Sequence, residues 1–86
     1  MPAYNLLIAT PDAILYEGEV KSVIFNGVEG NFEVLANHAP LITMTKKGVV
    51  EITDSNGNKN SVETGEGFFE FDKNKGVLLT QAVSVS

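Results

Sequence analysis

The single histidine of this 86-residue chain, His38, is the residue type best suited to acid–base or metal chemistry near neutral pH. A catalytic histidine needs a nucleophile or an orienting carboxylate within hydrogen-bond reach. Its neighbours along the chain, Asn37, Ala39 and Pro40, supply neither group. Three interpretations stay open: a turn histidine bonded to backbone, which we favour, a contact in a protein interface, and a catalytic or metal-binding group.

Eleven carboxylates could bind a cation or transfer protons, but they are scattered along the chain. The segment 54–58, Asp-Ser-Asn-Gly-Asn, lacks the closing glutamate of a calcium loop, so we predict a solvated hairpin there. Glu17 and Glu19 share one face of a predicted strand, which we expect to be a solvated edge. The sequence therefore predicts no metal-binding residue.

Two glycine pairs are weak candidates for binding phosphate. Gly65-Glu66-Gly67 precedes a strand instead of a helix, and Gly27 with Gly30 lacks the third glycine and the βαβ context of a dinucleotide site. Both pairs are predicted to form tight turns with positive φ. With no catalytic or cofactor-binding constellation, the chain is predicted to be a binding or assembly component and not an enzyme.

Short β-rich runs between turn signals predict the elements that position these residues. The runs are residues 4–10, 13–16, 20–25, 32–35, 41–45, 49–53, 60–64, 67–72 and 77–83. Alternation supports them: Val50 and Ile52 share a face opposite Glu51, and Phe69 and Phe71 share a face opposite Glu70. Turns spaced about eight to twelve residues apart are typical of an all-β sandwich or barrel, with almost no helix.

Composition removes several classes of function. The net charge is −5 and all six cations are lysine, which disfavours nucleic acid and anionic membrane surfaces as partners. The absence of cysteine excludes disulfides and thiolate zinc sites. No signal-peptide pattern or apolar run of about 18 residues is present, so we expect a soluble protein without direct membrane insertion.

The run Gly27-x-Glu29-Gly30-x-Phe32, followed by residues 38–43, His-Ala-Pro-Leu-Ile-Thr, resembles the epsilon-subunit family of bacterial F-type ATP synthases. Residues 4–6, 22–25, 47–52 and 65–71 extend the resemblance in order over nearly the whole chain. It implies a flattened β-sandwich of short, mainly antiparallel strands, which agrees with the strand pattern. We expect a single domain over residues 1–83 and a frayed tail at residues 84–86.

The resemblance implies a non-catalytic, cofactor-free subunit of the central stalk. Such a subunit binds the gamma subunit and contacts the rotor ring of c subunits, and so couples proton flow to ATP synthesis in the catalytic head. It also implies a peripheral location on the cytoplasmic side of the bacterial inner membrane.

Carried over by position, the resemblance implies two interfaces. The rotor-ring interface comprises Asn26, Gly27, Val28, Glu29, Gly30, Asn31, Phe32 and Glu33. The gamma interface comprises Thr10, His38, Ala39, Pro40, Leu41, Ile42 and Thr43. Val28 and Phe32 would serve as apolar anchors of the ring contact, although either could face the core instead.

The chain departs from the family pattern in several places. Family members usually continue into a pair of C-terminal helices that can inhibit ATP hydrolysis or bind ATP, whereas this sequence stops at Ser86. We therefore expect no self-inhibition by helix extension and no nucleotide site. Asn31, Glu33 and Asn37 also differ from the usual residues. The alternative functions are a stand-alone β-sandwich that binds a peptide or carbohydrate, and a small enzyme.

Overall fold

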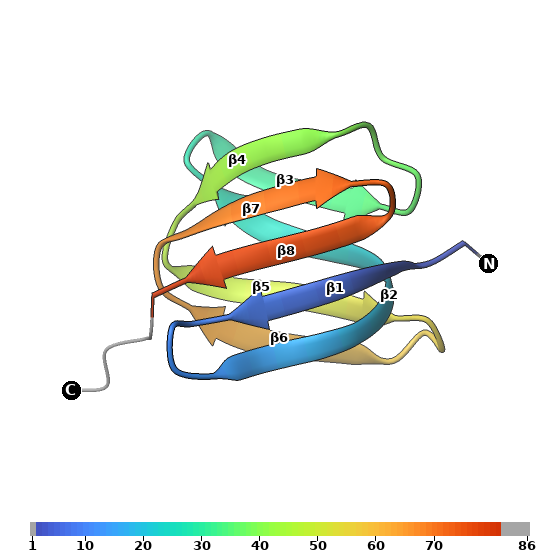
Figure 1. Ribbon diagram of the computed structural model, residues 1–86, viewed down its shortest axis with the longest axis horizontal. Helices are drawn as coiled ribbons and strands as arrows, with labels where there is room; N and C mark the ends of the chain where they lie inside the picture. Colours follow the sequence, from blue (N-terminus) through green and yellow to red (C-terminus); the bar gives the residue numbers. More distant parts are fainter. Residues whose placement is uncertain (1, 82–86) are drawn as a thin grey trace.

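The computed structural model describes residues 2–81, which form eight β-strands and no helix (Figure 1). The strands are β1 (Tyr4–Ala9), β2 (Ile14–Gly27), β3 (Gly30–Leu35), β4 (Leu41–Thr45), β5 (Gly48–Asp54), β6 (Lys59–Thr64), β7 (Gly67–Asp72) and β8 (Lys75–Thr80). The all-β prediction is confirmed. No helix capable of crossing a bilayer occurs in the described range. Residues 82–83 of the last predicted run and the predicted tail at 84–86 lie outside it.

The strands form one continuous sheet that folds into two layers (Figure 1). One layer, here called the front layer, holds β1, β8, β7 and β4 side by side in that order, and the other holds β3, β2, β5 and β6. β1 and β8 run parallel, and every other ladder is antiparallel. The prediction of a sandwich of short, mainly antiparallel strands is therefore confirmed.

The prediction of two separate strands at residues 13–16 and 20–25 is wrong, because β2 is one strand of 14 residues. Its first half pairs with β1, from Ile14 opposite Ala9 to Val20 opposite Tyr4. Its second half pairs with β3 on one side and β5 on the other. Gly18 does not end the strand, because it lies opposite Leu6 within the unbroken ladder between β1 and β2.

The core lies between the layers and is built from the inward face of each strand. Phe25 packs on Phe69 with ring centroids 4.3 Å apart, and Tyr4 meets Phe71 edge-on at 5.0 Å. The predicted alternation is confirmed, since Val50, Ile52, Phe69 and Phe71 are buried while Glu51 and Glu70 are exposed. The predicted hairpin at residues 54–58 joins β5 to β6.

Tyr4 ties the two layers together by a buried hydrogen bond. Its hydroxyl donates to the carbonyl of Val34 on β3, across the core, at 2.8 Å. Burial raises the pKa of the Tyr4 phenol, and the negative charge of Glu33 adds to the shift. The neutral phenol is therefore the form that the folded state requires.

Replacing Tyr4 by phenylalanine is expected to lower the free energy of unfolding at pH 7 by about 1 kcal/mol, because the Val34 carbonyl loses a buried donor. The unfolded phenol ionises near pH ~10, and the folded one at higher pH, so the wild type loses about 1.4 kcal/mol per pH unit above that point. Tyr4→Phe removes this contribution. Urea unfolding between pH 7 and 11 measures both effects, and parallel pH profiles would contradict the assignment.

Candidate functional site

The residues of the two predicted interfaces meet along a seam between β3 and β4. β3 pairs only with β2, and β4 reaches β2 only where Thr45 lies opposite Gly27, so no ladder joins β3 to β4. A hollow of about 340 Å³ occupies this seam. Its lining comprises Gly27, Val28, Glu29, Gly30, Asn31, Phe32, Glu33, His38, Leu41 and Thr43. The structure thus brings most of the predicted ring residues and three of the predicted gamma residues, His38, Leu41 and Thr43, to one seam.

The turn from Gly27 to Gly30 is shaped by a different constraint at each glycine. Gly30 has φ of 122°, as predicted, and a Cβ there would meet no atom within 4 Å. Positive φ is not what Gly27 requires: a Cβ at this position would lie 2.8 Å from the Gly30 carbonyl oxygen and 2.9 Å from the Phe32 ring. Gly65 and Gly67 also lack positive φ, and at both positions neighbouring backbone leaves no room for a side chain. An added Cβ would lie 2.7 Å from the carbonyl oxygen of Gln81 at Gly65, and 2.7 Å from that of Leu79 at Gly67.

The two expected apolar anchors of this turn behave differently. Val28 lies at the tip of the turn and is 54% exposed, and the exposed Glu29 lies beside it. Phe32 is half-buried and packs against the core, its ring 5.3 Å from that of Phe25. Phe32 therefore supports the turn from inside, and Val28 is the side chain free to contact another molecule.

The corner between β3 and β4 holds the histidine in a backbone contact. The Nδ1 of His38 lies 2.6 Å from the Ala39 carbonyl oxygen, which fits an Nδ1–H donor, and the ring edge meets Phe71 at 6.0 Å. The interpretation of a turn histidine bonded to backbone is confirmed. Ala39 and Pro40 are exposed next to it.

A pair of asparagines clamps this corner to the β7–β8 hairpin. Asn74 accepts from the Asn37 backbone N–H at 2.8 Å and donates from its side-chain amide to the Asn37 side-chain oxygen at 3.0 Å. Both residues have positive φ, 67° at Asn37 and 57° at Asn74, which asparagine tolerates better than most residues. The Asn74 carbonyl also accepts from the Asn5 N–H at 3.2 Å. The histidine corner is therefore held at a fixed place relative to the front layer.

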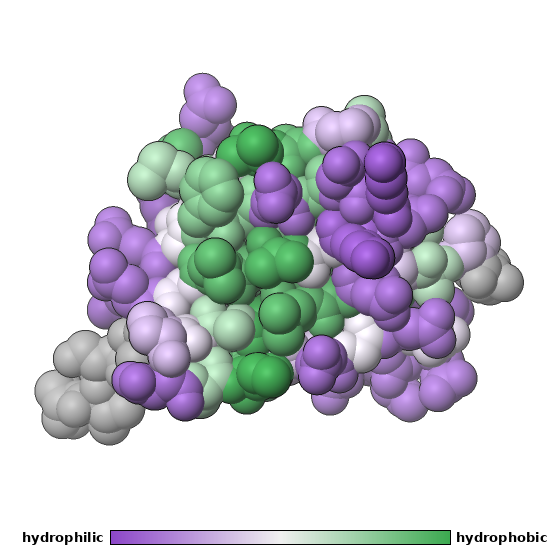
Figure 2. All heavy atoms as spheres, in the orientation of Figure 1, coloured by the Kyte–Doolittle hydropathy of each residue, from purple (hydrophilic) through white to green (hydrophobic). Residues whose placement is uncertain are grey.

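The outer face of the front layer carries a row of apolar side chains across four strands. Cross-strand partners place Met44 opposite Phe68, Phe68 opposite Leu79, and Leu79 opposite Ala9. Met44 is 63% exposed, Leu79 56% and Phe68 44%. Figure 2 shows hydrophobic residues gathered at the centre of this face and hydrophilic residues beside them. We call Ala9, Met44, Phe68 and Leu79 the apolar row.

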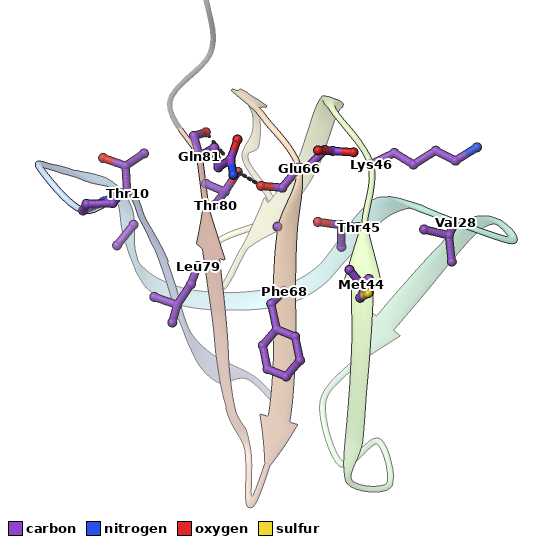
Figure 3. Close-up of a pocket in the computed structure, with 13 residues that line it drawn as sticks. Thr10, Val28, Met44, Thr45, Lys46, Glu66, Phe68, Leu79, Thr80 and Gln81 are labelled. Atoms are coloured by element: carbon purple, nitrogen blue, oxygen red, sulfur yellow. Dashed lines mark hydrogen bonds between the residues drawn. The ribbon is translucent and has the colours of Figure 1, made fainter.

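A second, larger hollow of about 600 Å³ lies over the apolar row (Figure 3). Phe68, Met44 and Leu79 project into it from β7, β4 and β8, while Lys46 and Glu66 stand at one end. Thr10 reaches this hollow from the β1–β2 turn, where its hydroxyl accepts from the Ala13 N–H at 3.1 Å. The Thr45 hydroxyl beneath the row is buried and has no hydrogen-bond partner within residues 2–81.

Thr10 does not lie with the other residues of the predicted gamma interface. His38, Leu41 and Thr43 line the seam, whereas Pro40, Leu41 and Ile42 border a further hollow beside Glu70. Ile42 is 62% exposed on the same outer face as the apolar row. The predicted gamma residues are therefore not gathered in one pocket: Ile42 lies on the outer face of β4, and Leu41 and Thr43 lie on its other face.

The carboxylates and the histidine of residues 2–81 do not gather into a metal-binding cluster. No group of three or more His, Cys, Asp or Glu residues there could hold a metal ion. Asp54, first residue of the segment compared with a calcium loop, uses its side chain to accept from the N–H groups of Asn56 and Asn58, each at 2.9 Å. These bonds, that from Asn58 above all, lower the pKa of Asp54. Glu17 and Glu19 are exposed, as predicted.

Sequence reasoning missed Met44, Phe68 and Leu79 as surface residues. The signal was present in β7 and β8, where Phe68-Phe69 and Leu78-Leu79 put large apolar side chains on both faces. A strand that is apolar on both faces is expected where both faces are covered.

The chain matches the family model described as ATP synthase, Delta/Epsilon chain, beta-sandwich domain, over residues 3–85. It is 42% identical to the ATP synthase epsilon chain of Chlorobaculum tepidum over 82 residues, covering 95% of this chain and 93% of the relative. It is 38% identical to the ATP synthase epsilon chain of Nitratiruptor sp. over 81 residues, which are 94% of this chain and 63% of that relative.

Two solved structures share the fold at low sequence identity. A chain in the Euglena gracilis mitochondrial ATP synthase structure of OSCP, F1 and c-ring superposes with a TM-score of 0.85 at 20% identity. A chain in the Tetrahymena thermophila mitochondrial ATP synthase structure of central stalk and c-ring gives 0.73 at 10%. The matches cover 93% and 90% of this chain but only 51% and 62% of those chains.

Replacing Gly27 by alanine is expected to lower the free energy of unfolding by about 1–3 kcal/mol, because the new methyl overlaps the Gly30 carbonyl and the Phe32 ring. Gly30→Ala is expected to cost about 1–3 kcal/mol through its positive φ alone. Adding Phe32→Leu should therefore recover part of the loss in Gly27→Ala and none in Gly30→Ala. Chemical denaturation of the four variants measures this, and equal responses would contradict the distinction.

Proposed function

Because the chain belongs to the ATP synthase delta/epsilon chain family through its beta-sandwich domain, we propose that it acts as a non-catalytic, epsilon-type subunit of the central stalk. In this role it binds the gamma subunit, contacts the rotor ring of c subunits and helps to couple proton flow to ATP synthesis in the catalytic head. It sits peripherally, on the cytoplasmic side of the bacterial inner membrane.

The observation that carries the proposal is the apolar row on the outer face of the front layer. Its large side chains are about half exposed or more, lie in direct cross-strand contact, and continue to Ile42. A contiguous apolar patch of this kind marks a protein interface more often than free surface. We assign this face to gamma, with Thr10 at one end and His38, Ala39 and Pro40 at the clamped corner at the other.

The rotor-ring contact is assigned to the tip of the Gly27–Gly30 turn. Val28 offers an exposed apolar side chain, and Glu29, Asn31 and Glu33 surround it with polar and acidic groups. An apolar anchor within a polar rim is the usual anatomy of a small contact between proteins. Asn26 and Phe32 contribute from behind, as supports of the turn.

The alternative of a stand-alone module for a peptide or carbohydrate is not favoured. Three relatives that each match more than nine-tenths of this chain are ATP synthase epsilon chains. The exposed face also carries one aromatic side chain, Phe68, where a carbohydrate site would call for several.

A charge at the centre of the apolar row is expected to abolish tight binding to gamma. Leu79→Asp should weaken the affinity at least ~30-fold, equivalent to about 2 kcal/mol, because the carboxylate must be desolvated in the interface. The matched control is Val49→Asp, which places the same charge at a 47% exposed position of the other layer. Calorimetry with purified gamma subunit measures both affinities. Equal weakening by the two variants, or none by Leu79→Asp, would move gamma to another face.

Val28→Asp is expected to weaken the ring contact by about 1–2 kcal/mol, because Val28 is exposed at the tip of the turn. Membranes that carry the assembled complex should then pump fewer protons for each ATP hydrolysed, at an unchanged rate of hydrolysis. Asn56→Asp adds the same charge at an exposed position of the β5–β6 turn and serves as control. Unchanged pumping with Val28→Asp would remove the ring contact from this turn.

A further inference from the structure

Beside the apolar row, the outer face of the front layer carries a second cross-strand row with one charged member. Val77 lies opposite Leu7 on one side and opposite Glu70 on the other, and Glu70 in turn lies opposite Ile42. Leu7, Val77 and Ile42 are apolar, so Glu70 is the one carboxylate of this row, and Asp72 is the next outward residue along β7. It lies two residues along β7 from Phe68, on the same face.

The front layer itself gives Glu70 no directly opposed cation. Its two directly opposed neighbours, Val77 and Ile42, carry no charge. Lys73 and Lys75 line a hollow beside Glu70, but Asp72 lines it too and lies directly opposite Lys75, so it competes for these cations. In the free chain water solvates the exposed carboxylate, and the arrangement costs little.

Covering this face changes that balance. A partner large enough to bury the apolar row and Ile42 also removes water from Glu70, which stands next to both Phe68 along the strand and Ile42 across it. A carboxylate buried in an interface without a compensating charge or donors costs several kcal/mol. A tight partner must therefore supply a cation at this place.

We propose that the partner that docks on the front layer places one lysine or arginine side chain against Glu70, inside an otherwise apolar contact. The inference rests on the proposed function, in which the partner is the gamma subunit. The aliphatic stem of the basic side chain packs over Ile42 and Val77 while its charged end reaches Glu70. Glu70 thereby determines the register of the partner along the strands, since an apolar row alone would allow sliding.

Two substitutions at Glu70 distinguish a carboxylate that pairs with a basic side chain of the partner from one that has no such pair. Glu70→Gln keeps the shape and removes the charge, and Glu70→Leu makes the second row wholly apolar. We expect both to weaken binding to purified gamma subunit by about 10- to 100-fold, because each leaves the partner's buried cation without its counter-charge. Glu63→Gln, an exposed glutamate of β6 in the other layer, is the control and should bind as wild type.

Whether Glu70→Leu weakens or tightens binding to gamma shows whether Glu70 has a basic partner there. If Glu70 had no basic partner, a leucine would add apolar contact and tighten binding, so an affinity equal to or above that of the wild type overturns the inference. That outcome leaves the proposed function intact, since the wild type still binds gamma. If the wild type itself fails to bind gamma, the proposed function fails, and the inference fails with it. Thermal melts of the free variants confirm folding.

Charge reversal identifies the partner residue. Glu70→Lys should bind gamma more weakly than Glu70→Gln, and replacing the facing lysine or arginine of gamma by glutamate should restore at least ~10-fold of the loss. Each basic residue of gamma is tested in turn against Glu70→Lys. Restoration by one such replacement supports the pair, and restoration by none overturns it.

Discussion

The long strand β2 is the constraint on which the rest of the domain depends. One half of its backbone is committed to β1 in the front layer, and the other half is bonded to β3 and β5 in the opposite layer. The two layers are therefore parts of one hydrogen-bonded sheet and cannot slide past each other without breaking ladders. The Tyr4–Val34 bond closes the same connection across the core. A domain this small has a modest core, so such a continuous ladder supplies order that packing alone would not.

The sequence predicts the strand content well because alternation and turn residues are local signals. Val50-Glu51-Ile52 and Phe69-Glu70-Phe71 show which face is buried, and the structure agrees. The joining of residues 13–16 to 20–25 was missed because Gly18 is locally a strand breaker, whereas in the structure it is paired with Leu6 inside the β1–β2 ladder. Nor can local pattern reveal that β1 and β8 lie parallel, since their contact joins the two ends of the described chain.

The candidate site was only partly visible in the sequence. The glycine turn and the histidine corner stand out by residue type, and the structure shows that they border one seam. The apolar row does not stand out, because its members come from four strands that are distant along the chain. Phe68 also resembles its buried neighbour Phe69 in type, and only the strand's two-residue period separates them. The sequence signal of such an interface is the presence of large apolar residues on both faces of β7 and β8.

The two proposed contacts need a stiff link, and β3 is built as one. Its six residues span roughly 20 Å between the turn that carries Val28 and the corner that carries His38. Each end has its own support: Phe32 packs behind the turn, and the Asn37–Asn74 clamp fixes the corner to the β7–β8 hairpin. Between them, all six residues of β3 are paired with β2. A displacement at one end therefore reaches the other through a ladder of hydrogen bonds and not through a loop.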